Sequence, residues 1–261
     1  MAEKARSLVA HARLSESDDP AVKLRQLYRA AYQREPTLAQ QEAALAFLAA
    51  EVESPSLAPR EETKAWSYGY GELDETAGKL KSFTPLPFFN GSAWQGGTSW
   101  PDAALGWVQI TARGGHPGND LQHASIRRWT APRAGTYSIT SQAIHEVAAG
   151  DGIRCWIVAS RVGILAKAAI HNRTEELNVA SVALEAGDTL DFIVDIHAGL
   201  NSDQHFWSTT VHETTPALDA HSLPQLWSSE PDFSGPAPIF LTPWEQLAQV
   251  LLLSNELMFV D

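Results

Sequence analysis

Cysteine and long apolar stretches are scarce in this sequence. Its 261 residues hold a single cysteine, Cys155, which excludes an intramolecular disulfide and every metal site built from several cysteines. No apolar run approaches the roughly 18 residues that a membrane-spanning helix needs. We therefore expect no membrane span. A composition with 44% hydrophobic and 19% charged residues is typical of a globular protein.

Basic residues are also few. The chain has 19 Lys and Arg against 31 Asp and Glu, a formal net charge of −12. An acidic balance of this size repels phosphate backbones, so we expect no nucleic-acid partner. The sequence also lacks a Gly-x-Ser-x-Gly motif, a phosphate-binding Gly-rich loop before a helix and a His-Glu-x-x-His helix. It thus predicts no catalytic residue and no enzyme; a hydrolase of unknown type is the weakest alternative.

The N-terminal part predicts a helical segment over residues 1–60. Its first residues are charged from position 3 onward and lack the long apolar centre of a secretory signal. One of two aspartates before Pro20 fits a helix cap, and Thr37 with Gln40 matches a capping box. Apolar residues recur at helical spacing after each start. We therefore expect two helices between residues 18 and 53 that form an antiparallel hairpin.

A different periodicity begins after the proline-containing linker at residues 54–60. Between residues 61 and 215, short alternating runs are bounded by Gly, Pro, Asn and Asp, which is the pattern of antiparallel strands. Nine such runs predict a jelly-roll-like β-sandwich. The expected strands are residues 66–70, 105–111, 122–131, 135–144, 153–160, 163–170, 177–184, 189–196 and 205–212.

Residues 216–261 predict a proline-rich wrap over the surface, followed by a helix. The wrap holds five prolines between residues 216 and 238. Thr242, Pro243 and Glu245 supply the cap, first-turn residue and capping-box partner of the helix. Since so apolar a helix needs a partner, we expect it to pack on the N-terminal helices. The predicted fold is mainly β with flanking helices, the sandwich being inserted in a small helical unit made from both termini.

Both ends of the chain carry a recognisable pattern. LRQLYRAAYQREPTLAQQEAALAFL at 24–48 and LTPWEQLAQVLLLSNELMFVD at 241–261 resemble the C-terminal region of large planctomycete-type proteins with a cytochrome c domain and two further regions of unknown function. This resemblance implies a longer, exported parent chain in the periplasm or at the cell surface, with its upstream domains as partners. The sequence has no Cys-x-x-Cys-His, so haem attachment is not carried over.

The middle of the chain is similar to β-sandwich modules of carbohydrate-binding type. The segments that carry the similarity are RRWTAPRAGTYSI at 127–139, GDGIRCWIV at 150–158 and AGDTLDFIVD at 186–195. These residues are mostly strand and turn formers, so the similarity implies the fold more strongly than the ligand.

Three predicted strands place a tryptophan on the same side as polar residues. Because a core tryptophan normally has apolar neighbours two positions away, we expect these rings to face solvent. Flat rings stack on the C–H face of a sugar, while neighbouring polar groups bind its hydroxyls. A sandwich also buries large aromatics in its core, which is the alternative. The candidate residues are Trp107 with Gln109, Trp129 with Arg127 and His123, and Trp156 with Arg154.

Two loops carry further candidates. Trp94 and Trp100 lie in the Gly-rich loop SAWQGGTSW, where they either bind a ligand or plug the end of the sandwich. Asp195, Asn201 and Asp203 are candidate calcium ligands, because hard cations need several oxygens. Sandwich modules of the resembled type often use calcium to fix a loop, although the resemblance identifies no matching ligands.

Taken together, these features predict non-catalytic binding of a polysaccharide or oligosaccharide by the sandwich. The alternative is a structural or protein-interaction module that positions an upstream redox or hydrolytic domain. The two differ in whether the tryptophans form a surface platform or belong to the core.

Overall fold

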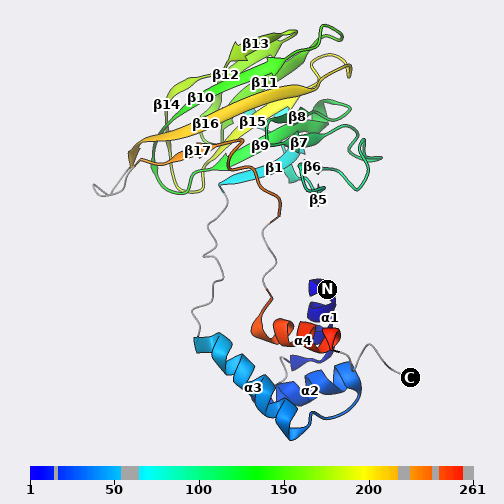
Figure 1. Cartoon of the computed structure of the whole chain (residues 1–261). Coiled ribbons are helices and arrows are strands. Elements are labelled where there is room, and N and C mark those ends of the chain that lie inside the picture. Colours follow the sequence, from blue (N-terminus) through cyan, green and yellow to red (C-terminus); the bar gives the residue numbers. More distant parts are fainter. Residues whose placement is uncertain (15–16, 54–64, 217–223, 237–240, 255–261) are drawn as a thin grey trace. The chain divides into compact units, whose positions relative to one another are not determined.

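The computed structural model describes residues 1–14, 17–53, 65–216, 224–236 and 241–254. The chain divides into two compact units. One, the helical unit, is made from Met1–Glu62 and Ala237–Asp261; the other, the β unit, spans Thr63–Pro236 (Figure 1). Among the described residues, no helix is both long and apolar enough to cross a membrane.

Four described helices form the helical unit, and residues from both ends of the chain share its core. Leu24 and Leu27 are fully buried in one cluster with Leu247, Ala248 and Leu251. The amphipathic C-terminal helix therefore buries its apolar stripe against N-terminal helices. The helices are α1 (Ala2–His11), α2 (Pro20–Tyr32), α3 (Leu38–Glu53) and α4 (Pro243–Leu253).

Local capping fixes where α2, α3 and α4 begin. The Asp19 side chain accepts a hydrogen bond from the Ala21 amide at 2.8 Å. Thr37 and Gln40 exchange the two bonds of a capping box, and Thr242 and Glu245 do the same at α4. The two expected helices between residues 18 and 53 are confirmed as α2 and α3. Helix α1 was not expected; its N-cap is Met1, which makes no side-chain capping hydrogen bond, so the sequence carries no start signal there.

Two large antiparallel sheets make the sandwich of the β unit, and β2 (Leu73–Asp74) and β3 (Lys79–Leu80) form a separate two-stranded sheet. One has six strands and the other nine, in which β14 and β17 lie beside β10 and β16. The six-stranded sheet runs β12 (Gly163–Ile170), β11 (Ile153–Ala159), β15 (Thr189–Asp195), β9 (Ala124–Thr130), β1 (Trp66–Gly71) and β4 (Thr84–Pro85). The nine-stranded sheet comprises β13 (Arg173–Glu176), β10 (Gly135–His145), β16 (His205–Pro216), β8 (Gly114–His116), β7 (Gln109–Thr111), β6 (Ala93–Gln95), β5 (Phe88–Phe89), β14 (Val179–Leu184) and β17 (Leu226–Ser228).

The chain crosses repeatedly between the sheets. From β9 it passes to β10, back to β11 and β12, over to β13 and β14, back to β15 and over to β16. These crossings produce the predicted antiparallel, jelly-roll-like sandwich, so the fold class is confirmed. The nine expected strands all overlap observed ones, although 105–111 shortens to β7. Shorter strands were missed because two to four residues carry no clear alternation.

The main core lies between the two sheets. Alternate residues of the strands meet there; on β11 these are Ile153, Cys155 and Ile157, all fully buried. Burial raises the pKa of the Cys155 thiol, which favours its neutral form. Aromatic rings fill much of this space, with Trp129 and Tyr137 in edge contact at 5.1 Å.

A second, smaller cluster covers the opposite face of the six-stranded sheet. It includes Ile126 from β9, Trp156 from β11 and Ile193 from β15. The hairpin of β2 and β3 contributes Leu73 and Leu80 to this cluster. The middle of this sheet is therefore buried on both faces.

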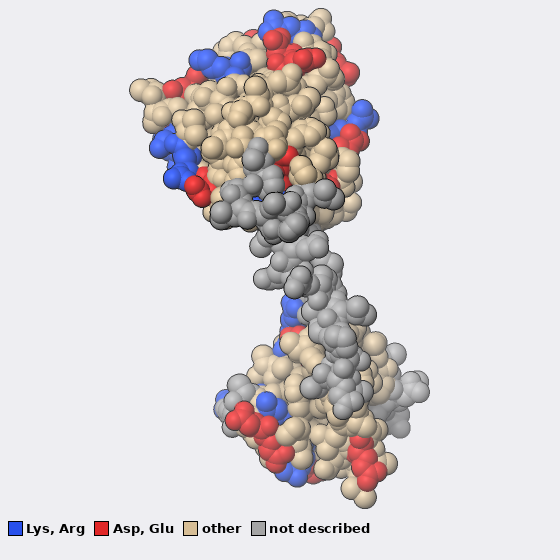
Figure 2. Space-filling model, turned by 90° about the vertical axis from the view of Figure 1, so that its left-hand side faces the viewer, with Lys and Arg blue, Asp and Glu red and all other residues tan. Residues whose placement is uncertain are grey.

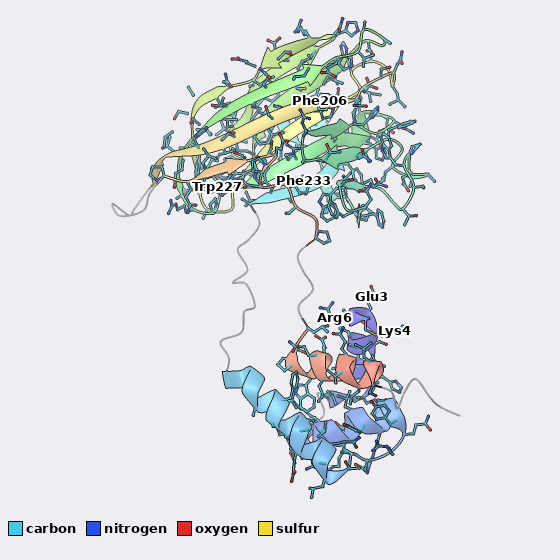
Figure 3. The ribbon with its side chains drawn as sticks, viewed as in Figure 1. Glu3, Lys4, Arg6, Phe206, Trp227 and Phe233 are labelled. Carbon is cyan, nitrogen blue, oxygen red and sulfur yellow. The ribbon has the colours of Figure 1, made fainter. Side chains whose placement is uncertain are left out.

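The segment after β16 belongs to the β unit. We expected residues 216–261 to form one C-terminal segment, but residues up to Pro236 fall in the β unit. Strand β17 pairs with β16, and Trp227 packs 5.1 Å from Trp129. The ring centroid of Phe233 lies 4.8 Å from that of Tyr68; Figure 3 labels Trp227 and Phe233. This division arises because both rings complete the main core. Residues 217–223 and 237–240 of the expected wrap lie outside the described part of the chain.

Trp129→Ala is expected to lower the free energy of unfolding of the β unit by roughly 3–5 kcal/mol, since it leaves a large cavity between the sheets. Trp107→Ala is the matched control, because Trp107 is 36% exposed, whereas Trp129 is 0% exposed. We expect the control to lose less than about 1 kcal/mol. Urea denaturation followed by circular dichroism measures both changes. Equal losses for the two variants would contradict this core assignment.

Candidate functional site

The three strand tryptophans differ in their surroundings. Trp107 faces solvent as predicted, with Val108 and Ile110 buried on the other side. The same prediction is wrong for Trp129 and Trp156, which are 0% and 2% exposed. The three rings therefore do not form a shared platform.

The alternation pattern predicted the wrong surroundings for Trp129, because the polar residue on the same side of the strand is itself buried. Arg127 shares the inner face of β9 and is 6% exposed. Its guanidinium donates to the backbone oxygen of Thr111 at 2.7 Å, and to those of Ala112 and Trp207 at 3.3 Å each. Burial lowers the pKa of Arg127 to about 10. Arg127 was expected to bind sugar hydroxyls, but its guanidinium is instead bonded to backbone carbonyls inside the sandwich.

Trp156 lies on the side opposite the core, as alternation predicted, but that side is covered. The guanidinium of Arg154 sits 4.8 Å from the centre of its ring. Arg154 also donates to both oxygens of Asp195, at 3.0 and 2.6 Å, and to Glu75 at 2.6 Å. Trp156 and Arg154 were both expected to contact a ligand. Instead they contact each other and the residues of the sheet and of the hairpin that covers it.

Three further candidates contact other protein groups. Gln109 Nε2 donates to the side chain of the buried Gln95 at 3.1 Å. His123 lies 2.7 Å from Asp120 Oδ1 and stacks on Tyr70. Trp94 Nε1 donates to the Ser234 carbonyl at 2.9 Å, and its ring packs against the main core. Trp94 thus fits the plug interpretation.

The candidate calcium ligands do not fit a calcium ion in this arrangement. Both Asp195 oxygens accept hydrogen bonds from Arg154, whose positive charge opposes a cation. The side-chain oxygen of Asn201 accepts from Ser202 Oγ, and one Asp203 oxygen accepts from the Asn201 amide. A single oxygen, Asp203 Oδ1, is left without a described partner, whereas calcium takes about 6–8 oxygens. Among the described residues, no three His, Cys, Asp or Glu side chains are grouped to hold a metal.

A pocket of about 460 Å³ lies beside Trp100 and Trp107. We call it the aromatic pocket. It is formed by the loop before β7, the end of β8 and the loops that follow β10 and β15. Its lining residues are Trp100, Trp107, His116, Val147, Leu200, Asn201, Ser202 and Gln204.

Two exposed indole rings form one wall of the aromatic pocket. Trp100 and Trp107 are 40% and 36% exposed. Their rings meet edge to face with centroids 4.9 Å apart, and Trp100 Nε1 donates to the Trp107 carbonyl at 2.9 Å. This bond fixes one ring against the other, so the rings are oriented before any ligand arrives.

His116 extends this aromatic wall and remains neutral. Its ring lies 5.7 Å from that of Trp107. The Nδ1–H donates to the Pro117 carbonyl at 2.6 Å, which leaves Nε2 as an acceptor in the neutral ring. Burial lowers the pKa of His116. The strand that carries His116 packs so closely against β16 that a Cβ at Gly114 would lie 2.0 Å from the His205 carbonyl oxygen.

The facing wall is a set of loops held by hydrogen bonds to the buried His145 and the exposed Asp151. His145 Nε2 donates to the Ser202 carbonyl at 2.9 Å, and the carboxylate of Asp151 accepts from the Ala198 amide at 2.8 Å. Gly150 adopts a positive φ of 82°, and a Cβ there would lie 2.1 Å from the Asn201 carbonyl oxygen. The two loops therefore pack backbone to backbone, which orders the pocket wall.

Sequence reasoning missed the apolar part of this facing wall, although Asn201, a candidate calcium ligand, lies in it. Val147 and Leu200 are each 38% exposed and line the pocket, yet neither was a candidate. The signal available was an apolar residue inside a loop rich in Gly, Asn and Asp, as in HAGLNSDQ at 197–204. Trp100 and Trp107, both predicted site residues, are brought together; the other predicted ligand-binding residues do not line this pocket.

No family model and no curated protein matches the chain. Parts of it are similar to solved structures. A family 35 carbohydrate-binding module from an environmental isolate is 14% identical, covering 47% of this chain and 84% of that one, with a TM-score of 0.25. The C-terminal CBM6 of the laminarinase LamC from Zobellia galactanivorans is 18% identical, covering 34% and 72%, with a TM-score of 0.22. Rabbit GITRL is 10% identical, covering 34% and 73%, with a TM-score of 0.27.

Asp203→Asn is expected to change how stability depends on pH. Burial raises the pKa of Asp203 to about 6 in the folded chain, above the ordinary value of about 3.9. The folded state therefore binds this proton more tightly, and its ionisation destabilises the fold as pH rises from about 4 to 6. Asparagine carries no such cost and retains an acceptor for the Asn201 amide.

Denaturation of wild type and variant at pH 4 and pH 7 measures this effect. Tryptophan fluorescence reports on the β unit, which holds every tryptophan except Trp244. The stability difference should move in favour of Asp203→Asn by about 1–3 kcal/mol between the two pH values. A difference independent of pH would contradict the burial of an ionising carboxyl.

Proposed function

We propose that the β unit is a non-catalytic carbohydrate-binding module whose glycan binds in the aromatic pocket. The observation that carries this proposal is the gathering of exposed apolar side chains there. Seven large hydrophobic side chains of the described β unit are exposed, and four of them line this one pocket. Gathered exposed apolar groups mark interaction sites, whereas single ones are ordinary. The four are Trp100, Trp107, Val147 and Leu200.

The chemistry of the pocket suits a sugar. Exposed indole faces stack against the C–H groups of a pyranose ring, while amides and hydroxyls bond to its hydroxyl groups. Trp107 and Trp100 supply the rings; Asn201, Ser202 and Gln204 supply the polar groups from the facing loop. The pocket thus combines an aromatic wall with a polar one.

The lining of the pocket supports binding without hydrolysis. Most glycosidases need two carboxyl groups on either side of the scissile bond. None of the residues that line the aromatic pocket is an aspartate or a glutamate. The weakest alternative, a hydrolase, therefore gains no support from this site.

The surroundings of the module are a separate part of the proposal. The resemblance of residues 24–48 and 241–261 to the ends of planctomycete-type cytochrome c domain proteins supports a larger, exported parent chain. In such a chain the module would hold upstream domains near polysaccharide in the periplasm or at the cell surface. A purely structural or protein-interaction module is the competing function.

Trp107→Ala and Trp100→Ala are each expected to weaken retention by polysaccharide about tenfold or more. Ring contacts of this kind contribute about 0.5–1.5 kcal/mol beyond the burial of their area, and 1.4 kcal/mol corresponds to tenfold. Affinity gel electrophoresis against a panel of polysaccharides measures retention. Trp107→Phe, which keeps a smaller ring, should lie between wild type and Trp107→Ala.

Val162→Ala serves as the matched control, because Val162 is 62% exposed and does not line the pocket. It should leave retention unchanged. Undiminished retention of Trp107→Ala would place the glycan elsewhere on the β unit. Failure of the wild-type chain to bind any polysaccharide would instead favour the structural or protein-interaction function.

A further inference from the structure

We propose that the aromatic pocket selects uncharged glycans and rejects those that carry carboxylate or sulfate groups. This inference rests on the proposed function and adds the chemical class of the ligand. Recognition of an anionic sugar normally uses Arg or Lys, whose charge offsets the cost of removing the anion from water. The lining residues include no Lys, Arg, Asp or Glu.

The polar groups of the pocket match hydroxyls. Asn201 and Gln204 are exposed, and each amide offers both a donor and an acceptor. Ser202 adds a hydroxyl that donates to Asn201 Oδ1 at 3.2 Å. A sugar hydroxyl also donates and accepts, so such groups pair with it in either direction. A carboxylate accepts only, so it would use half of this capacity.

His116 does not supply a positive charge to the pocket. Burial lowers its pKa, so the ring is neutral at pH 7. With Nδ1–H donated to the Pro117 carbonyl, Nε2 presents a lone pair. A hydroxyl can donate to that lone pair, whereas an ionised carboxylate would be repelled by it.

The residues next to the lining in the chain are acidic. Within two positions of a lining residue, the charged side chains are Asp102, Glu146 and Asp203, with no Lys or Arg. The whole chain has a formal net charge of −12. An anionic polymer that approaches the pocket would therefore meet like charge.

Two partly buried arginines of the β unit are already paired with carboxylates. Arg128 is bidentate with Asp191, and Arg133 pairs with Glu213. Figure 2 shows a face of the β unit whose centre is largely uncharged, with Lys, Arg, Asp and Glu side chains mostly around its edge. Removing either arginine from its partner would leave a buried carboxylate without its counter-charge.

The test compares three chemical forms of the same polysaccharide. Four polysaccharides are used: xylan, mannan, galactan and mixed-linkage β-glucan. Each is offered unmodified, hydroxyethylated and carboxymethylated, and retention of the full protein chain is measured by affinity gel electrophoresis. The hydroxyethyl form controls for bulk. We expect retention by the neutral and hydroxyethylated forms of the preferred backbone, and at least tenfold weaker retention by its carboxymethylated form. Raising NaCl from about 50 to 500 mM should not weaken retention by the neutral form.

The outcomes separate this inference from the proposed function. Equal or stronger retention by the carboxymethylated form, or retention that salt abolishes, would overturn the selectivity while leaving carbohydrate binding in place. Retention by no form of any backbone would overturn both. Loss of retention by the hydroxyethylated form as well would attribute the rejection to bulk, which also overturns the charge argument.

A charge placed in the pocket provides a second test. Gln204→Lys should strengthen retention by the carboxymethylated backbone at least tenfold, and raising the salt concentration should remove that gain. Gln225→Lys is the matched control, because Gln225 is exposed and lies outside the pocket. An equal gain in both variants would show a general effect of net charge, and no gain in Gln204→Lys would overturn the inference.

Discussion

Burial of both faces of the six-stranded sheet is the constraint on which the rest of the β unit depends. One face of β9, β11 and β15 meets the other sheet, while the opposite face carries the second cluster, to which the β2–β3 hairpin contributes. A side chain in the middle of these strands has little route to solvent, whatever its chemistry. Recognition is therefore left to the ends of the strands, where loops from both sheets meet.

Burying polar groups inside the sandwich requires partners for them. Asp191 and Asp195 lie on the covered face, and burial raises the pKa of each while the paired arginine lowers it. Arg127, on the other face, uses three carbonyl groups instead of a carboxylate. These polar groups hold strands and loops in place and are not available to a ligand. The same residue types that suggested a binding face thus serve the architecture.

The loops around the aromatic pocket depend on a second set of internal bonds. His145, Asp151 and Gly150 fix the backbone of the loops after β10 and β15, and the Trp100 indole is bonded to the Trp107 carbonyl. Loops that are already ordered lose less conformational entropy when a ligand binds, which lowers the free-energy cost of binding. Exposed apolar groups held in fixed positions are the feature that distinguishes this pocket from an ordinary loop surface.

Local patterns in the sequence determined the helix starts, the strand periods and the sandwich class. Capping boxes and alternation act over three or four residues, so Thr37, Thr242 and the longer strands of the sandwich were within reach of sequence reasoning, whereas the four-residue β13 was not. Alternation also assigned Trp156 and Cys155 correctly to opposite faces. It could not tell which faces would be covered, because the cover comes from segments far away in the chain.

The tertiary structure alone decided which tryptophans remain exposed. Trp129 is covered by Trp227, 98 positions further on, and Trp107 is not covered. The pocket likewise depends on loops whose meeting follows from the order of strands in two sheets. The sequence by itself determined the kind of elements and which residues of a strand share one side. The packing of distant segments determined which of those sides meets water, because burial is a property of the assembled surface and not of any single strand.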